Sequence, residues 1–395
     1  MNVVIAALSA PAQLNGVSRH ATNLARALLS TQGVAKLHFL AGEWQAPMFR
    51  SVLDDGDPRL HIHWIALKDA NFSRILWYFR ELPCIAAQLD ADIVHLTYPA
   101  PIASKAFHCP TALSLHDLYP FDIPQNFGFW KSAFARKVMT RCIKNVDAIA
   151  CVSASTKARL EEWFPAEINK ATVIPNVVEL KPLASPDRPF ERLNGRSFVL
   201  CVAQHRRNKN VPLAIRAFAR ALATKTLAAD SRLFIVGIPG PETTRIQAQI
   251  RETGLVGKVL LGSGLSDAEL RWCYENCDVL LVPSEAEGFG LPVAEGLLAG
   301  CRIVCSDIPA FWEVGGGACR YVSWEGDLPG LYADAIRLAL TLPKPARASL
   351  PQFSLQVIGR DYLRFYQDLI CSRVSGFDML RQPKGPPKAV RSRSA

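Results

Sequence analysis

The sequence has no apolar run of the roughly 18 residues that a membrane-spanning helix requires. Its first residues, MNVVIAALSAPAQ, carry no basic segment and only a short apolar stretch, so we expect a first β-strand here and no cleaved signal peptide. It lacks C-x-x-C pairs, although it has 11 cysteines, and most of them lie in apolar segments, as Cys151, Cys201 and Cys305 do. We therefore expect buried free thiols in a reducing cytoplasm and no disulfide framework.

The motifs of several other protein classes are missing as well. The sequence has no G-x-S-x-G nucleophile elbow, and no nucleic-acid-binding motif accompanies its net charge of +10. DAD at 90–92, DDGD at 54–57 and GGGA at 315–318 do not have the strand and loop context that a metal or phosphate site needs. His61 and His63 have no carboxylate or cysteine pattern beside them. We therefore expect no metal, no cofactor and no nucleic-acid partner.

The composition favours a folded α/β protein of two domains. Apolar residues make up 49% of the 395 residues and charged residues 20%, enough to bury sizeable cores. Apolar runs at 2–8, 92–96, 111–115 and 147–152 alternate with helical patterns, which indicates a parallel sheet. A second alternation contains the expected strands SFVLCVA, RLFIVG, KVLLG, DVLLVP and RIVCS.

The segment KPLASPDRPFER at 181–192 has three prolines and no periodicity, so we interpret it as an interdomain linker. We predict an acceptor-side Rossmann-like domain at 1–183, a donor-side Rossmann-like domain at 195–350 and a C-terminal helix at about 352–371. The last segment, 372–395, holds six Lys/Arg and one Asp, and we predict a disordered basic tail there.

Polar residues follow the predicted strands at the edge where doubly wound sheets bind ligands. Gly16 comes after the first strand, and His116 with Asp117 comes after the strand at 111–115. The basic segment 204–209 and Glu287 follow two strands of the second domain. If the domains face each other across a cleft, these side chains converge on it.

The stretch SEAEGFGLPVAEGLLAG at 284–300 places two carboxylates around a predicted helix start. Gly288 and Gly290 permit a tight turn and a close approach to a ligand. A helix N-terminus attracts phosphate, whereas Glu287 and Glu295 are favourable there only if they accept hydrogen bonds from neutral hydroxyls. A nucleotide sugar has hydroxyls at both ends and phosphate between them, so the spacing points to such a ligand.

A cluster of cations in QHRRNKN supplies the opposite charge. We expect Asn210 to cap the next helix, which places Arg206, Arg207 and Lys209 at its N-terminus. Fixed cations at this position stabilise a diphosphate as it gains charge on leaving a sugar.

EGFGLPVAE at 287–295 resembles the E-x7-E signature of the retaining glycosyltransferases of family four, which have the GT-B fold of two Rossmann-like domains. The resemblance extends from Asn2 to about Ile370. It rests on further segments in the family's order, namely NGVSRHATNLARAL, SLHDLYP, ACVSASTKARL, VIPN and SDIPAFWEV. It implies two doubly wound domains that face across a cleft, with the C-terminal helix packed back on the first.

The resemblance also implies roles for single residues. Glu295 would bind the ribose, Glu287 the hydroxyls of the donor sugar and Lys209 the diphosphate, with His116 near the reacting sugar. The backbone at Gly288, Phe289, Gly290 and Leu291 would also contact the sugar. The chain departs from the family in having Asn15-Gly16 for the glycine pair, Val177 for a glycine and Gln204 for a diphosphate-binding arginine. Arg206 or Arg207 is expected to take over the role of that arginine.

These features together predict a cytoplasmic, retaining, metal-independent hexosyltransferase. It would transfer a sugar from a nucleotide diphosphate sugar to an acceptor hydroxyl, in polysaccharide or lipid-linked saccharide synthesis. Two alternatives stay open: a GT-B nucleotide-sugar epimerase, which converts the donor without an acceptor, and a non-catalytic nucleotide-sugar-binding protein, which shows no turnover.

The segment 129–144 combines cations with aromatic residues at helical spacing. Lys137, Arg141 and Lys144 recur beside Phe129 and Trp130, as in helices that lie on anionic membranes. An ordinary solvated helix face has the same pattern. The pattern is therefore compatible with a protein at the inner face of the plasma membrane and with one that has an ordinary solvated helix.

Overall fold

A computed structural model of the chain describes residues 1–9, 15–53, 56–67, 72–126, 128–180, 193 and 195–381, the last eight of these by backbone alone. The predicted linker at 181–192 and residues 382–395 of the predicted tail lie outside the described residues.

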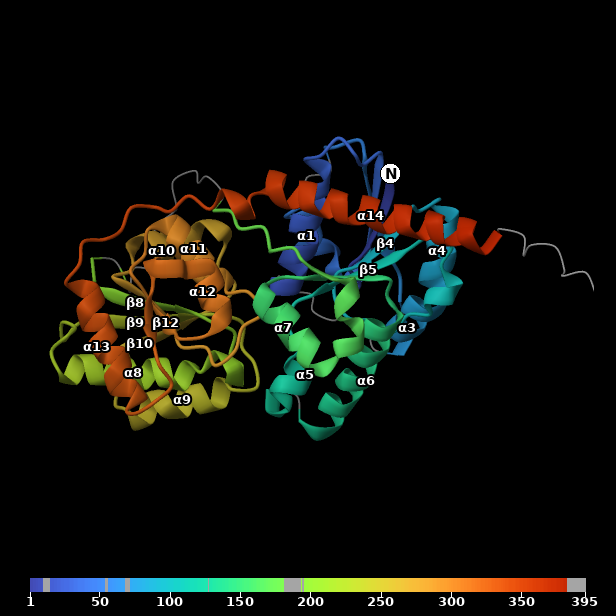
Figure 1. Cartoon of the computed structure of the whole chain (residues 1–395). Helices are drawn as coiled ribbons and strands as arrows, with labels where there is room; N and C mark the ends of the chain where they lie inside the picture. Colours follow the sequence, from blue (N-terminus) through green and yellow to red (C-terminus); the bar gives the residue numbers. More distant parts are fainter. Residues whose placement is uncertain are drawn as a thin grey trace, which may run out of the picture.

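The described chain forms two parallel sheets with helices on both faces (Figure 1). The first sheet has the order β3-β2-β1-β4-β5-β6-β7 and the second the order β10-β9-β8-β11-β12-β13. The strands of the first are β1 Asn2–Ala6, β2 Lys36–Gly42, β3 Leu60–Ile65, β4 Ile93–Leu96, β5 Thr111–Leu115, β6 Ala148–Cys151 and β7 Ala171–Val173. Those of the second are β8 Phe198–Val202, β9 Arg232–Val236, β10 Val259–Gly262, β11 Val279–Val282, β12 Ile303–Ser306 and β13 Arg320–Val322. Both orders are Rossmann-like, and the predicted fold class is confirmed.

Helices alternate with these strands along the chain. In the first half they are α1 Gly16–Leu29, α2 Ala46–Arg50, α3 Phe72–Leu76, α4 Leu82–Gln88, α5 Tyr119–Asp122, α6 Phe129–Asn145 and α7 Ala154–Trp163. In the second they are α8 Val211–Ala223, α9 Thr243–Glu252, α10 Asp267–Asn276, α11 Leu291–Ala299, α12 Pro309–Gly315 and α13 Leu328–Leu340, and α14 Leu355–Arg381 ends the described chain.

One helix start follows its local sequence signal and another departs from it. The S-x-x-E pattern at 266–269 is typical of a capping box, and Ser266 and Glu269 form that box at α10. The structure also shows a capping box of Asn15 with Ser18 at α1. Asn210 does not cap α8 with its side chain, contrary to expectation. It has φ 45° and ψ 41°, a left-handed conformation that Asn tolerates, because the 3₁₀ turn Arg207–Lys209 immediately precedes the helix.

The inner strands of the first sheet, β1, β2, β4, β5 and β6, bury side chains on both faces. Val4 and Ala6 of β1 belong to the core that includes residues of α4 and α6, whereas Val3 and Ile5 belong to the core with residues of α1 and α14. This two-sided burial explains the continuous apolar runs of the strands. All 11 cysteines are free and eight of them are buried, among them the three expected to be so.

The long helix α14 lies across the first domain (red in Figure 1). It packs closely on α1, where a Cβ at Gly359 would lie 2.1 Å from the carbonyl oxygen of Ala27. The helix continues to Arg381, beyond the predicted end at 371, so its last ten described residues correct the expectation of a disordered tail from 372. The helix passes through Gly376, no proline lies between 372 and 381, and the Arg373 guanidinium donates to the Phe107 carbonyl at 3.0 Å.

Candidate active site

The strand order of the second sheet reverses between β8 and β11. The loops that follow these two strands bring an oppositely charged pair of side chains together. Lys209 follows β8, Glu287 follows β11, and the Lys209 Nζ lies 2.5 and 2.7 Å from the two carboxylate oxygens. The side chains are 17% and 7% exposed. The sequence predicted both residues for the site, but it gave no signal that they contact each other.

The Glu287 loop is held from both domains. The Ala286 carbonyl accepts hydrogen bonds from the Tyr119 hydroxyl of the first domain and from Asn208 Nδ2 of the second, each at 3.1 Å. The Glu285 amide donates to the Asn208 carbonyl at 2.7 Å. The carboxylate of Glu287 therefore projects from a loop whose backbone is fixed on both sides.

Gly288 of the second domain lies against the backbone of the first domain. A Cβ there would lie 1.7 Å from the His116 carbonyl oxygen. The Gly288 carbonyl accepts from Ser153 Oγ at 2.5 Å and from Thr156 Oγ1 at 3.0 Å, both in the first domain. The absence of a side chain at Gly288 therefore lets the Glu287 loop approach the backbone of the first domain, in addition to any approach to a ligand. Gly290, by contrast, has φ 103°, a backbone conformation that residues other than glycine rarely adopt.

His116 is fixed in one tautomer at the end of β5. Its Nε2 lies 2.9 Å from the Thr97 carbonyl, so Nε2 carries the proton and Nδ1 is the acceptor of the ring. Burial lowers the pKa of His116 to about 4, and the bond to Thr97 opposes this shift only in part. Burial likewise raises the pKa of the neighbouring Asp117 to about 6, against a bond from the Tyr119 amide and the charges of Arg206 and Lys209.

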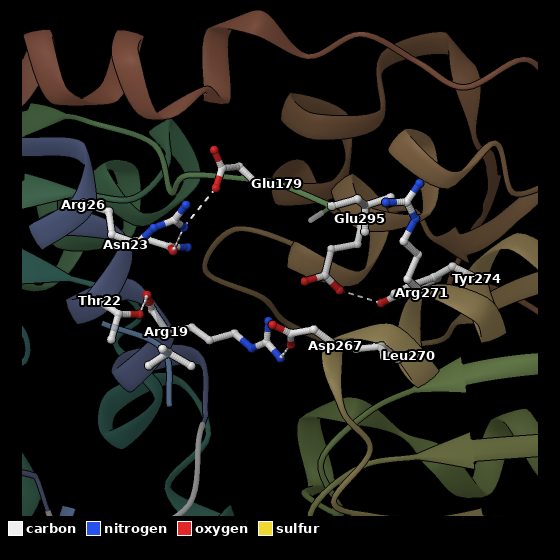
Figure 2. Close-up of a pocket in the computed structure, with 12 residues that line it drawn as sticks. Arg19, Thr22, Asn23, Arg26, Glu179, Asp267, Leu270, Arg271, Tyr274 and Glu295 are labelled. Atoms are coloured by element: carbon white, nitrogen blue, oxygen red, sulfur yellow. Dashed lines mark hydrogen bonds and ion pairs between the residues drawn. The ribbon is translucent and has the colours of Figure 1, made fainter. Parts of the chain in front are cut away.

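Glu295 lies in the second turn of α11, facing a polar pocket between the domains (Figure 2). Tyr274 of α10 donates its hydroxyl to Glu295 Oε2 at 2.7 Å. Burial raises the pKa of Glu295, whereas the Arg19 guanidinium and the Tyr274 bond lower it. Arg19 belongs to α1 of the first domain and pairs across the pocket with Asp267 at 2.6 Å.

A further interdomain contact lies at α7. The carboxylate of Glu313 on α12 accepts from the amides of Ala154 and Ser155, at 2.7 and 2.6 Å. The unpaired amides of a helix start in one domain are therefore satisfied by a carboxylate of the other. Sequence reasoning missed Arg19, Tyr274 and Glu313, because each acts through a neighbour that only the fold brings near.

The remaining predicted residues are placed as follows. Arg206 and Arg207 are exposed at the end of β8, and the Arg207 charge opposes the rise that burial causes in the pKa of Glu285. Gly16 begins α1, and within the described part of the chain no atom beyond its sequence neighbours lies within 4 Å of its Cβ position. The Phe289 side chain is buried against Phe353, at a ring separation of 5.3 Å, so only its backbone is available to a ligand.

The chain matches two family models. Residues 14–181 match the model described as Glycosyltransferase Family 4, and residues 186–350 match that of Glycosyl transferases group 1.

Curated relatives match part of the chain. The O-antigen chain mannosyltransferase RfbU of Salmonella typhimurium is 25% identical over 55% of this chain and 60% of its own length. A diphospho-undecaprenol 4-alpha-N-acetylgalactosaminyltransferase of Campylobacter jejuni is 25% identical over 63% of this chain and 68% of its own. The serotype-specific mannosyltransferase WbdA of Escherichia coli is 26% identical over 61% of this chain and 30% of its own length. The match thus spans from under a third to about two thirds of these relatives.

Solved structures share the fold over nearly the whole chain. Sucrose-phosphate synthase of Thermosynechococcus elongatus superposes with a TM-score of 0.65 at 17% identity, over 96% of this chain and 98% of its own. WaaG, a glycosyltransferase involved in lipopolysaccharide biosynthesis, gives 0.64 at 17% identity, over 96% and 99%. With two matched family models in the order that the sequence resemblance requires and two Rossmann-like sheets, the chain belongs to the family-four glycosyltransferases of the GT-B fold.

Proposed function

We propose that the protein transfers a sugar from a nucleotide diphosphate sugar to an acceptor hydroxyl with retention of configuration. The observation that carries this proposal is the placement of Lys209, Glu287 and Glu295 around the start of α11. A cation, a helix N-terminus and two carboxylates around one helix start match the alternating phosphate and hydroxyl groups of such a donor.

The two carboxylates receive different parts of the donor. Glu295 lies inside α11 and beside Tyr274, and we assign it to the ribose hydroxyls. Glu287 lies in the loop before the helix, and its neighbour Gly288 lies against the backbone of His116. We assign Glu287 to the hydroxyls of the donor sugar. The acceptor nitrogen Nδ1 of neutral His116 suits a sugar hydroxyl as donor.

The cations serve the leaving group. When the bond between the anomeric carbon and the diphosphate oxygen breaks, negative charge grows on the diphosphate. Lys209, with Arg206 and Arg207 beside it, supplies preorganised positive charge there, so the proposal does not assign a metal or any cofactor to this role.

We further propose that the acceptor oxygen attacks the face from which the diphosphate leaves. The acceptor's proton then passes to the departing phosphate oxygen, and the new bond has the configuration of the old one. Glu287 is paired to Lys209 and is therefore a hydroxyl acceptor in this scheme rather than a covalent nucleophile. Mass spectrometry of the enzyme during turnover tests this point, because a glycosyl adduct on Glu287 contradicts it.

Calorimetry with UDP, GDP and ADP tests the roles of the carboxylates. Glu295→Ala is expected to weaken binding of the matching nucleotide by about 1.5–3 kcal/mol, the value of a charged hydrogen bond. Glu287→Ala should leave nucleotide affinity nearly unchanged and should abolish most turnover, because the free nucleotide has no sugar. Equal losses of nucleotide affinity in both variants would contradict this division.

The same preparations separate the alternatives. Incubating UDP-glucose, UDP-N-acetylgalactosamine, GDP-mannose and ADP-glucose without acceptor reveals an epimerase by the appearance of an isomeric donor. The absence of turnover with all donors and a panel of saccharide and lipid-linked acceptors would support a binding protein.

We propose a saccharide or lipid-linked saccharide as acceptor, since the similar proteins named above include O-antigen and undecaprenol-linked transferases. Among the helices that the structure describes, none is long and apolar enough to cross a bilayer. Helix α6 instead offers a surface that fits an anionic membrane: Phe129 and Trp130 are 79% and 83% exposed, beside the exposed Lys137 and Lys144.

Co-sedimentation with vesicles tests this surface. We expect salt-sensitive binding to vesicles of anionic phosphatidylglycerol and none to neutral phosphatidylcholine. Lys137→Glu with Lys144→Glu should abolish most of it, whereas Lys225→Glu with Arg251→Glu, exposed residues of the second domain, should not. Arg141 is left unchanged because its guanidinium packs over Phe79 at 5.1 Å. Failure of the wild-type protein to pellet at low salt would contradict the membrane proposal.

A further inference from the structure

A buried chain of hydrogen bonds crosses the first domain from α14 to the cleft. The Tyr366 hydroxyl lies 2.9 Å from His95 Nδ1 on β4, and His95 Nε2 lies 2.8 Å from Ser114 Oγ on β5. Ser114 Oγ in turn lies 2.7 Å from His20 Nε2 on α1. These side chains are between 0% and 6% exposed, so none of them faces solvent or a ligand directly.

Asn176 fixes the direction of every bond in the chain. Its Oδ1 lies 2.8 Å from His20 Nδ1, and an amide oxygen only accepts, so Nδ1 carries the proton and Nε2 accepts. Ser114 must then donate to His20, and its oxygen accepts the proton on His95 Nε2. His95 Nδ1 is left to accept the hydroxyl of Tyr366. This assignment satisfies each group with neutral rings.

The surroundings keep the rings neutral. Burial lowers the pKa of His95 to about 3, with a further contribution from His116. Burial also lowers the pKa of His20 well below its usual range, again with contributions from His116 and His95.

The far end of the chain touches His116. The His20 and His116 rings meet edge to face, with centroids 4.6 Å apart and planes at 83°. The Thr97 carbonyl holds Nε2 of His116, so His20 and Thr97 together define where the acceptor nitrogen of this ring points. A shift of His20 therefore moves the His116 ring within the cleft.

We propose that His20 is a positioning residue for His116, and that the chain Tyr366–His95–Ser114–His20 makes this position depend on the docking of α14. Helix α14 is suited to that role because it starts just after the polypeptide returns from the second domain to the first. Phe353, immediately before it, packs against Phe289 of the Glu287 loop, and its carbonyl accepts from the Val178 amide at 2.9 Å. The effect on turnover rests on the function proposed above; the hydrogen-bond chain itself does not.

Two tyrosines on one helix give a matched pair of variants. Tyr366→Phe removes the first donor of the chain and leaves His95 Nδ1 without its partner. Tyr362→Phe removes an equally buried hydroxyl, one helical turn earlier, that reaches Ser114 Oγ at 3.2 Å as a side branch. Ser114 still accepts from His95 and donates to His20 in the second variant, so the chain stays whole.

Nitrogen-15 spectra of the histidine-labelled full chain provide the readout that does not depend on activity. In Tyr366→Phe we expect a mixture of His95 tautomers and displaced resonances of His20 Nε2 and of the His116 ring. Tyr362→Phe should leave the His95 and His116 tautomers as in the wild type. Unmoved His116 resonances in Tyr366→Phe, or the same displacement in both variants, would overturn the proposal.

Nucleotide release from GDP-mannose, or from the donor that the panel above identifies, provides the second readout. Tyr366→Phe should lower kcat about three- to tenfold, the rate equivalent of one ordinary hydrogen bond, with little change in KM. Tyr362→Phe should stay within about twofold of the wild type. Matched kcat values in the two variants contradict the positioning role, whereas a wild type without turnover refutes the proposed function and leaves the spectra to decide on the chain.

Discussion

The substitution Gly288→Ala tests how far the cleft depends on the contact between the two domains. The added methyl carbon would lie 1.7 Å from the His116 carbonyl oxygen and 2.9 Å from its carbonyl carbon. Both partners are backbone atoms, so no side-chain rotation relieves the contact. The Glu287 loop or the end of β5 must retreat by more than about 1 Å to restore an ordinary carbon–oxygen separation.

This retreat has a predictable magnitude. The hydroxyls of Ser153 and Thr156 lose the Gly288 carbonyl, at about 0.5–1.5 kcal/mol each, and the overpacked contact adds about 1–3 kcal/mol. A displacement of about 1 Å next to reacting groups lowers rates by about 10²-fold. We therefore expect kcat/KM to fall about a hundredfold and the free energy of unfolding by about 2–6 kcal/mol, as measured by steady-state kinetics and urea titration.

Gly317→Ala is the matched control. Gly317 lies in a turn before β13, and among the described residues no atom other than those of its chain neighbours lies within 4 Å of its Cβ position. It should behave as the wild type in both measurements. A Gly288→Ala enzyme with kcat/KM within about twofold of the wild type would show that the domains do not need this contact, and the reasoning would be refuted.

Three further predictions follow from the charges of the cleft. Lys209→Ala should lower kcat more than donor affinity, since the leaving diphosphate gains charge, and Arg207→Ala should do the same if it replaces the missing arginine; a purely KM effect in donor titrations contradicts this. Arg19→Gln should raise the pKa of Glu295 further, so nucleotide affinity, followed by calorimetry across pH, should be lost at a higher pH than in the wild type as the pH falls. The free energy of unfolding should fall as the pH drops from about 6.5 toward 4, because His116 and His95 become protonated in the unfolded chain but stay neutral when buried in the fold. The contribution of His116 alone is on the order of 3 kcal/mol, and the raised pKa of Asp117 offsets part of it. Urea titrations that show equal stability at pH 7 and pH 5 would argue against this prediction.

The fold was predictable wherever the sequence pattern is local. The strands at 92–96 and 111–115 read as apolar runs and are found as β4 and β5, and the capping box at Ser266 marks α10 correctly. Strand β7, by contrast, has only three residues and no apolar run of its own. Its place in the sheet comes from pairing with β6, which no local pattern reveals.

The candidate site was predictable only as a set of positions. Lys209 and Glu287 stand out because they follow apolar strands, and Glu295 stands out because it interrupts an otherwise apolar helix. Their partners do not stand out, since Tyr274 and Arg19 lie on helices that look like ordinary amphipathic ones. The bond from Tyr274 to Glu295 joins two helices of one domain, and the pair of Arg19 with Asp267 joins two domains. Such contacts depend on tertiary distances that the sequence pattern does not encode.

The ion pair of Lys209 and Glu287 also constrains how a donor enters. In this structure each charge neutralises the other, and both side chains are largely buried. A buried charge that loses its partner costs several kcal/mol unless another group replaces it. Under the proposed function, a nucleotide sugar would replace both partners at once, with its diphosphate on Lys209 and its sugar hydroxyls on Glu287. A free nucleotide has no sugar hydroxyls, so it would bind with the pair of Lys209 and Glu287 still in place. In this proposal the two charges separate only when the whole donor binds, which agrees with a nucleotide affinity that does not depend on Glu287.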